Sequence, residues 1–187
     1  MKRVFVAVDI SDEARKKVAA YVEGLRGYLG SRAASWVRPE KLHLTLHFVG
    51  DCDDDELRRL TELVGKCAAK TRLFDIAIEG TGVFPNSRRA RILWLGIRDD
   101  GKHLNFIQSN LEPQTGPSDN QKPFRPHLTI ARIKDARASR EVVAKHLANT
   151  FEPVEFGVSE IVIYESTLTR DGSVYSVLST YQLKGTS

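Results

Sequence analysis

The sequence contains few cysteines and no long run of apolar residues. Cys52 and Cys67 are the only two cysteines, and neither has a cysteine or histidine at the spacing of a metal site. We therefore expect reduced thiols and no disulfide. The apolar residues 4–8 end at Asp9, too early for a signal peptide, and no segment has the length of a membrane span. These absences predict a cytoplasmic protein that does not enter membranes.

The sequence also lacks a strong bias in composition. Hydrophobic residues form 41% and charged residues 28% of the 187 positions, which is close to the average of folded domains and excludes a disordered or collagen-like chain. The length predicts one compact domain. Lys and Arg number 28 against 24 Asp and Glu, so the small positive charge favours polyanionic ligands without requiring them.

Two halves of the sequence share the same order of elements. Each half has the patterns typical of a strand, a helix, a strand, a helix and a strand. In the first half, Ser11 is suited to begin one helix, and Asp53 with Glu56 has the spacing of a capping box for the next. Strands are expected at residues 3–9, 42–49, 73–79, 91–97, 127–133, 156–165 and 174–183. We predict that residues of about 3–80 and 91–183 are repeated halves of one domain.

The middle strands of the two halves carry near-identical tetrads. These are His43-Leu44-Thr45-Leu46 and His127-Leu128-Thr129-Ile130. Because side chains alternate between the faces of a strand, each histidine shares a face with its threonine. One such pair is typical of a structural hydrogen bond, whereas two at equivalent places of a repeat indicate a shared site. If the halves pack about a pseudo-twofold axis, both pairs line one cleft.

Two facing imidazoles are suited to the hydrolysis of a phosphodiester. In-line displacement at phosphorus needs a base that takes a proton from water and an acid that gives one to the leaving oxygen, and imidazoles titrate in the required pH range. A hydroxyl beside each imidazole can donate to the non-bridging phosphate oxygens, where negative charge accumulates. The pattern therefore favours a phosphodiesterase that uses His43 and His127 without a metal ion.

Other readings of these residues remain open. Strand alternation places His47 on the His43 face as well, so a zinc site built from His43, His47 and His127 is conceivable, although no acidic residue or cysteine is placed alongside to complete it. Arg88, Arg89 and Arg91 could approach RNA phosphates or be a solvated charge run. Three aromatic residues could stack on a base or pack in the core, and core packing is favoured for at least two of them: Trp36, Phe48 and Phe124. The aperiodic residues 113–126 suggest a lid or binding loop, and His103 and His146 are assigned no chemistry.

Further motifs surround the two tetrads, and with them the sequence resembles a known superfamily. They include Arg3-Val4-Phe5-Val6-Ala7, Phe48-Val49-Gly50, Arg91-Ile92-Leu93-Trp94-Leu95-Gly96, Pro123-Phe124-Arg125-Pro126 ahead of His127, and Tyr164-Glu165-Ser166 with Tyr175. The chain resembles, nearly end to end, the 2H phosphoesterase superfamily. Within it, the similarity is to the RNA 2′,3′-cyclic phosphodiesterases once described as 2′-5′ RNA ligases.

The resemblance implies both a fold and an activity. It implies an α+β fold of two pseudo-symmetric antiparallel-sheet lobes, with outer helices, around a central cleft. The implied reaction converts a terminal 2′,3′-cyclic phosphate of RNA to a 2′-phosphate without a cofactor. In this resemblance, His43 protonates the departing 3′ oxygen, His127 activates water, and Thr45 and Thr129 donate to the phosphate. Arg132 resembles the phosphate-contacting arginine of the family.

The expected partner is an RNA or oligonucleotide with a 2′,3′-cyclic phosphate end, and a cleft within one chain gives no reason to require a dimer. Two other functions are also compatible with these residues. The same acid/base pair can run the reverse reaction, joining RNA ends by a 2′-5′ bond, and a module that binds RNA or nucleotides without turnover would also need a cleft. The polar residues 114–121 differ from the family pattern and leave the substrate preference open.

Overall fold

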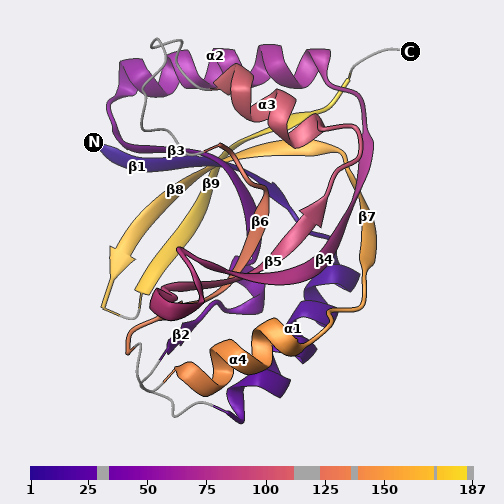
Figure 1. Cartoon of the computed structure of the whole chain (residues 1–187). Helices are drawn as coiled ribbons and strands as arrows, with labels where there is room; N and C mark the ends of the chain where they lie inside the picture. Colours follow the sequence, from indigo (N-terminus) through magenta and orange to yellow (C-terminus); the bar gives the residue numbers. More distant parts are fainter. Residues whose placement is uncertain (29–33, 112–122, 136–138, 171, 185–187) are drawn as a thin grey trace.

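The fold consists of two antiparallel sheets, which form the two lobes (Figure 1). The computed structural model describes residues 1–28, 34–111, 123–135, 139–170 and 172–184. The first sheet has the strand order β3-β1-β8-β9, and the second has the order β2-β6-β5-β4-β7. The strands of the first sheet are β1 (Lys2–Asp9), β3 (His43–Cys52), β8 (Glu160–Thr169) and β9 (Gly172–Gln182). Those of the second are β2 (Ala34–Trp36), β4 (Phe74–Phe84), β5 (Ile92–Arg98), β6 (His127–Ile133) and β7 (Val154–Val158).

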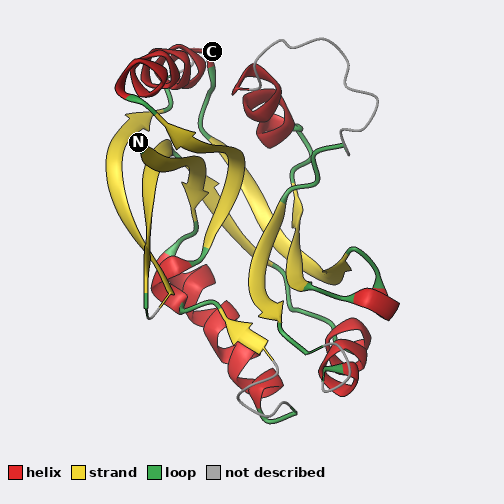
Figure 2. Ribbon diagram, turned by 90° about the vertical axis from the view of Figure 1, so that its left-hand side faces the viewer, coloured by secondary structure: helices red, strands yellow, loops and turns green. Residues whose placement is uncertain are grey.

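Two longer helices cover the outer side of each sheet, as Figures 1 and 2 show. They are α1 (Asp12–Arg26), α2 (Asp54–Lys70), α3 (His103–Leu111) and α4 (Arg140–Ala148). Helices α2 and α3 contact each other and the first sheet, while α1 and α4 contact each other and the second. Helix α1 therefore follows a strand of the first sheet but packs on the second, and α3 makes the opposite crossing. The expected α+β fold of two antiparallel-sheet lobes with outer helices is confirmed.

Side chains at the first turns explain where the helices begin. The Ser11 hydroxyl accepts a hydrogen bond from the Ala14 amide at 3.2 Å and so caps α1. At the start of α2 the Glu56 amide donates to Asp53 Oδ1 at 2.8 Å, and the Asp53 amide donates to Glu56 Oε2 at 2.9 Å. This is the predicted capping box, with both of its hydrogen bonds.

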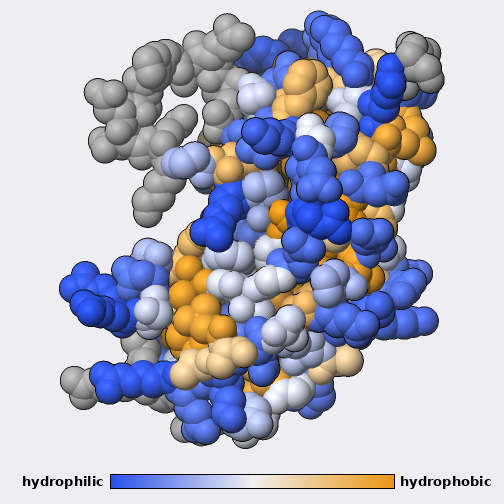
Figure 3. Space-filling view, turned by 45° about the vertical axis from the view of Figure 1, so that its right-hand side comes forward, coloured by the Kyte–Doolittle hydropathy of each residue, from blue (hydrophilic) through white to orange (hydrophobic). Residues whose placement is uncertain are grey.

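Apolar side chains fill the space between each sheet and its helices. In β1, Val4, Val6 and Val8 are at most 1% exposed, and in α2 the stripe of Leu60, Val64 and Cys67 packs inward. The face shown in Figure 3 carries mostly hydrophilic side chains, with hydrophobic ones in several places, the clearest group at its lower left. None of the helices in the described ranges is long and apolar enough to cross a membrane. Burial of this apolar surface is the main source of stability of such a fold.

One predicted strand is in fact two. Residues 156–165 were expected to form a single strand, but β7 ends at Val158 and β8 begins at Glu160. The reason is tertiary, because β7 pairs with β4 in the second sheet and β8 pairs with β1 in the first. The chain thus passes from one lobe to the other at Ser159. Local alternation of apolar residues cannot reveal such a crossing, because both strands continue the same pattern.

Candidate active site

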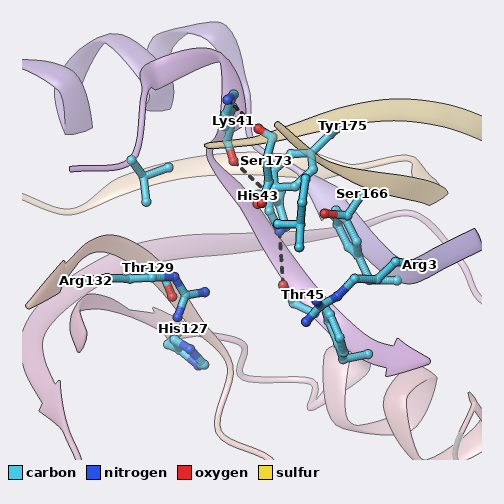
Figure 4. A pocket seen from close by; sticks show the side chains of 14 residues that line it. Arg3, Lys41, His43, Thr45, His127, Thr129, Arg132, Ser166, Ser173 and Tyr175 are labelled. Carbon is cyan, nitrogen blue, oxygen red and sulfur yellow. Dashed lines mark hydrogen bonds between the residues drawn. The ribbon is translucent and has the colours of Figure 1, made fainter. Parts of the chain in front are cut away.

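A cavity of about 350 Å³ lies between β3 of the first sheet and β6 of the second. All five residues singled out as a site from the sequence line it: His43, Thr45, His127, Thr129 and Arg132. Figure 4 shows His43 and Thr45 on one strand, with His127, Thr129 and Arg132 across the cavity from them. We call this space the central cavity. The two tetrads, far apart in the sequence, therefore contribute to one cavity.

A β-bulge lies at the same place in both tetrads. In β3, Thr45 pairs with Ala7 and His47 with Val6, so Leu46 has no partner in the ladder. In β6, Thr129 pairs with Trp94 and Ala131 with Leu93, so Ile130 is the extra residue. An extra residue on one strand shifts the alternation of side chains beyond it. Strand β3 therefore presents His43, Thr45 and Phe48 to the central cavity. Strand β6 presents the equivalent residues His127, Thr129 and Arg132.

The bulges explain two residues that simple alternation misplaces. Phe48 pairs with Phe5, and Arg132 pairs with Ile92, so both lie on the cavity side of their strands and line the cavity. His47, by contrast, pairs with Val6, whose side chain is fully buried on the other face, and it does not line the cavity. The expectation that His47 shares the face of His43 is therefore wrong. Among the described residues, no group of histidine, cysteine, aspartate or glutamate is arranged to hold a metal ion.

The His43 ring is held by hydrogen bonds at both nitrogens. Nδ1 lies 2.8 Å from the Lys41 carbonyl oxygen, which can only accept, so Nδ1 carries the proton. Nε2 is therefore the acceptor of the Thr45 hydroxyl at 3.1 Å (Figure 4). Burial lowers the pKa of His43, the bond to Lys41 and the charge of Asp9 raise it, and Arg132 and Arg15 lower it further. The net direction favours neutral imidazole near neutral pH.

His127 is oriented in the same way. Its Nδ1 donates to the Arg125 carbonyl oxygen at 2.8 Å, so Nε2 keeps its lone pair for a ligand. Phe84 packs edge-on against the ring, with 4.9 Å between the ring centroids. Burial lowers the pKa of His127, with the Arg125 bond opposing this change and the charges of Arg125 and Arg132 adding to it. Both imidazoles are thus fixed by the carbonyl two residues before them, with Nδ1 protonated.

Arg125, whose carbonyl oxygen orients His127, is held by a contact of its side chain with the Trp94 ring. The Arg125 guanidinium lies 4.5 Å from the centroid of the Trp94 ring, a cation–π distance. The Trp94 ring in turn lies so close to Gly82 that a Cβ there would be 2.1 Å from Trp94 Cζ2. Gly82 is therefore required by space, because any larger residue would displace the indole. This contact fixes Arg125, and with it the hydrogen-bond acceptor of His127.

The two histidines differ in the residue directly across the ladder. Asp9 pairs with His43, and the Tyr164 hydroxyl donates to both oxygens of Asp9 at 2.9 and 2.8 Å. Gly96, which has no side chain, pairs with His127. Burial and the neighbouring Asp9 raise the pKa of Tyr164, which keeps the hydroxyl a donor. In the part of the chain that the structure describes, a carboxylate therefore stands across the ladder from one imidazole only.

The remaining candidates from the sequence lie outside the central cavity. Arg88 lines a separate hollow between residues 87–90 and α4, and neither Arg89 nor Arg91 lines the central cavity. Trp36 and Phe124 pack against the core, as favoured for two of the three aromatic residues. Most of the suggested lid, residues 113–126, lies outside the described residues.

Neither of the two histidines that were assigned no chemistry lines the central cavity. His146 is fully buried, with Nε2 3.1 Å from the carbonyl oxygens of Gly82 and Trp94 and Nδ1 2.9 Å from the Tyr21 hydroxyl. His103 bonds to Asp99 and stacks on Phe74. These contacts give each histidine a structural role.

Sequence reasoning missed several residues of the central cavity. Arg3, Lys41, Ser166 and Tyr175 line it together with the five expected residues. The sequence predicts a strand at residues 3–9 but assigns neither of its faces to the site, so the cavity side of β1 was overlooked. A signal was present, because Arg3 is two residues from Phe5 and strand alternation places both on one face. The register of β1 against β3 was needed to show that this face meets the tetrad.

Comparisons with known proteins identify the family. The model of the LigT-like phosphoesterase family matches residues 8–94 and 95–175. A protein from Archaeoglobus fulgidus named RNA 2′,3′-cyclic phosphodiesterase is 32% identical over 182 residues, which is 96% of this chain and 99% of that one. A protein of the same name from Thermotoga maritima is 31% identical over 187 residues, or 98% of this chain and 96% of the relative.

Solved structures agree over the whole fold. TT0787 of Thermus thermophilus has a TM-score of 0.77 at 29% identity and covers 98% of both chains. LigT of E. coli complexed with 3′-AMP has a TM-score of 0.73 at 25% identity, covering 97% of this chain and 98% of that one. Similarity of this extent in both sequence and structure leaves one assignment. The chain belongs to the LigT-like phosphoesterase family, within the 2H phosphoesterases.

Proposed function

We propose that this protein hydrolyses 2′,3′-cyclic phosphates at RNA ends, with His43 and His127 as its acid/base pair and with no metal ion. The observation that carries the proposal is the arrangement of two imidazole–threonine pairs, from equivalent places of two sheets, around one cavity. The relatives named RNA 2′,3′-cyclic phosphodiesterase support the substrate class, as does the E. coli LigT complex with 3′-AMP.

The phosphate would lie between the two histidines, held by cationic and hydroxyl groups. Arg132 and the hydroxyls of Thr45 and Thr129 can donate to the non-bridging oxygens, where charge accumulates as water attacks phosphorus. Arg132 thus supplies the positive charge that a metal ion supplies in other phosphodiesterases. The Thr45 hydroxyl donates to His43 Nε2 in the structure. Protonation of Nε2 ends that bond and frees the hydroxyl hydrogen for a phosphate oxygen.

The neighbours of the two histidines support one division of roles between them. Asp9 stands across the ladder from His43, and a negative charge favours imidazolium, the form that a general acid needs. Gly96 stands across from His127, and the charge of Arg125 lowers the pKa of His127, which favours neutral imidazole, the form of a general base. Arg132 lowers the pKa of both histidines and does not distinguish them. His127 takes a proton from the attacking water as its oxygen bonds to phosphorus. The bond to the 3′ oxygen breaks, and His43 protonates that oxygen to leave a 2′-phosphate.

The competing function is a module that binds RNA ends without turnover. A dinucleotide with a 2′,3′-cyclic phosphate end separates the two functions when its phosphorus resonance is followed by NMR. We expect the cyclic signal to be replaced by that of a 2′-phosphate, in the presence of EDTA as well as without it. Binding with no change of the cyclic signal would support the binding module. Loss of activity in EDTA that is restored by a divalent ion would overturn the metal-independent mechanism.

A monomer is also proposed, because the described residues of one chain contribute both tetrads to the central cavity. Rejoining of RNA ends by the same groups is expected from microscopic reversibility when two ends are held at high concentration.

A further inference from the structure

Arg3 lies on the cavity side of β1 but is unused in the mechanism above. Strand β1 alternates regularly, so Arg3 and Phe5 face the central cavity while Val4 and Val6 are fully buried on the opposite face. In Figure 4, Arg3 and Arg132 lie on different sides of the cavity, and both side chains reach toward its middle. The cavity therefore receives a guanidinium from each sheet.

Arg3 makes no ion pair within the described part of the chain, although Asp51 is its partner in the β1–β3 ladder. No carboxylate of the described residues lies within ion-pair distance of it, whereas Arg15, Arg26, Arg58 and Arg98 each have such a partner. Within the described ranges, no acidic residue lines the central cavity. The third cation there, Lys41, donates from Nζ to the Ser173 carbonyl oxygen at 2.5 Å. Among the described residues, Arg3 is thus a cation without an ion-pair partner, beside a site that already has Arg132 for one phosphate.

Aromatic rings separate Arg3 from the proposed reaction centre. The Phe5 ring lies 4.8 Å from His43 and 6.3 Å from Phe48 between ring centroids, and the Arg3 guanidinium lies 5.2 Å from the Phe48 centroid. The Phe48 side of this row is accessible, because Phe48 is 53% exposed. From the histidines outward, the cavity therefore offers first a phosphate site, then exposed aromatic surface and then a cation. A terminal nucleotide has the same order: cyclic phosphate, nucleoside and linking phosphate.

We propose that Arg3 binds the phosphodiester that joins the terminal nucleotide to the rest of the RNA, while Arg132 and the histidines hold the cyclic phosphate. The inference rests on the proposed function and narrows its substrate class. Two phosphates separated by one nucleoside are bound together, so an RNA of two or more nucleotides is preferred over a mononucleoside cyclic phosphate. A guanidinium can grip a phosphate through two parallel hydrogen bonds, which a lysine cannot reproduce.

The test compares a dinucleotide that ends in a 2′,3′-cyclic phosphate with adenosine 2′,3′-cyclic phosphate, which has no linking phosphate. Arg3→Ala should raise KM for the dinucleotide by roughly tenfold or more and leave KM for the mononucleoside unchanged. Raising the salt concentration should weaken dinucleotide binding more in the wild type than in the variant, because Arg3→Ala makes one phosphate contact fewer. Arg3→Lys should restore part of the difference, since it keeps the charge without the fork.

Lys2→Ala is the matched control, because Lys2 is the neighbouring cation on the opposite face of β1. It should leave KM for both substrates unchanged. Equal effects of Arg3→Ala on both substrates, or no effect on either, would overturn the inference while leaving the proposed function intact. Affinities for the two corresponding 2′-phosphate products are measured alongside turnover. If the wild type hydrolysed neither substrate, the proposed function would fail, and these product affinities would still decide the role of Arg3.

Discussion

Asp9 of β1 lies directly opposite His43 of β3, and its carboxylate accepts two contacts from the Tyr164 hydroxyl. The charged groups around His43 come from several elements: Asp9 from β1, Arg15 from α1, Lys41 next to the tetrad and Arg132 from β6, with the Tyr164 hydroxyl from β8. Of the described groups whose charge shifts the pKa of His43, Asp9 is the only anion. The ladder thus makes the two imidazoles electrostatically unequal, although the tetrads are nearly identical.

The pH profile of the wild type should have its maximum on the acidic side of 6.5. In the proposed mechanism His127 must be neutral and His43 protonated, and the pKa values of both are lowered from 6.5 in the free protein. Because kcat/KM reports the free enzyme, both limbs of its profile should lie below that value. The profile of kcat should lie at higher pH, because a bound phosphate anion stabilises imidazolium. A kcat/KM maximum well above 6.5 would contradict the assignment.

Replacing Asp9 with Asn should move one limb of that profile. The charge of Asp9 raises the pKa of His43, so its removal lowers this pKa and shifts the alkaline limb of kcat/KM to lower pH. The acidic limb, which reports His127, should stay in place. An asparagine oxygen can still accept from the Tyr164 hydroxyl, so the fold is preserved. Histidine resonances followed by NMR should show the same selective change, whereas movement of the acidic limb alone would reverse the two roles.

Alanine at either histidine should lower kcat by roughly 10²- to 10⁴-fold, the usual contribution of a general acid or base. A cyclic substrate with sulfur in place of the 3′ oxygen separates the two roles, because a thiolate leaves without needing a proton. This substrate should restore much of the rate of His43→Ala and little of that of His127→Ala. Full activity of either variant on the normal substrate would remove that residue from the mechanism. Equal rescue of both variants would refute the division of labour.

The folded state should lose stability as the pH falls below 6.5. Burial lowers the pKa of His43, His127 and His146, so below 6.5 the unfolded chain binds more protons than the native one. The contribution of these histidines to the free energy of unfolding is therefore fully present above pH 6.5. It decreases as the pH falls through that value. Urea denaturation at a series of pH values measures this change. His146→Gln should reduce the slope whatever its absolute stability, and an unchanged slope would show that His146 does not contribute.

Much of the site was predictable because strand alternation is a local property. The pairing of His43 with Thr45 and of His127 with Thr129 follows from a period of two, and all four residues line one cavity. The two bulges were not predictable, because an extra residue is defined only against a partner strand. This is why His47 was placed on the wrong face. The crossing of the chain from one sheet to the other at Ser159 was missed for a similar reason. Only the partner strands show which sheet each segment joins.

The predicted repeat of residues 3–80 and 91–183 remains a proposal, and the pairing pattern supports it. Strand β1 pairs with β3, and β5 pairs with β6, with bulges at the fourth residue of each tetrad. A later strand of each half pairs across to the other half, because β4 joins β5 and β8 joins β1. We infer a duplicated unit whose copies have exchanged strands. The cytoplasmic location expected from the sequence stays a prediction.

The passages of the chain between the two sheets have a mechanical consequence. Because α1 and α3 each pack on the lobe opposite to their preceding strand, and because β7 and β8 belong to different lobes, neither lobe is a continuous piece of chain. A fragment cut between the tetrads would lack strands of both sheets. Heat or denaturant should therefore melt both lobes in one cooperative transition. The repeated crossings of the chain therefore tie together the two sheets that flank the central cavity.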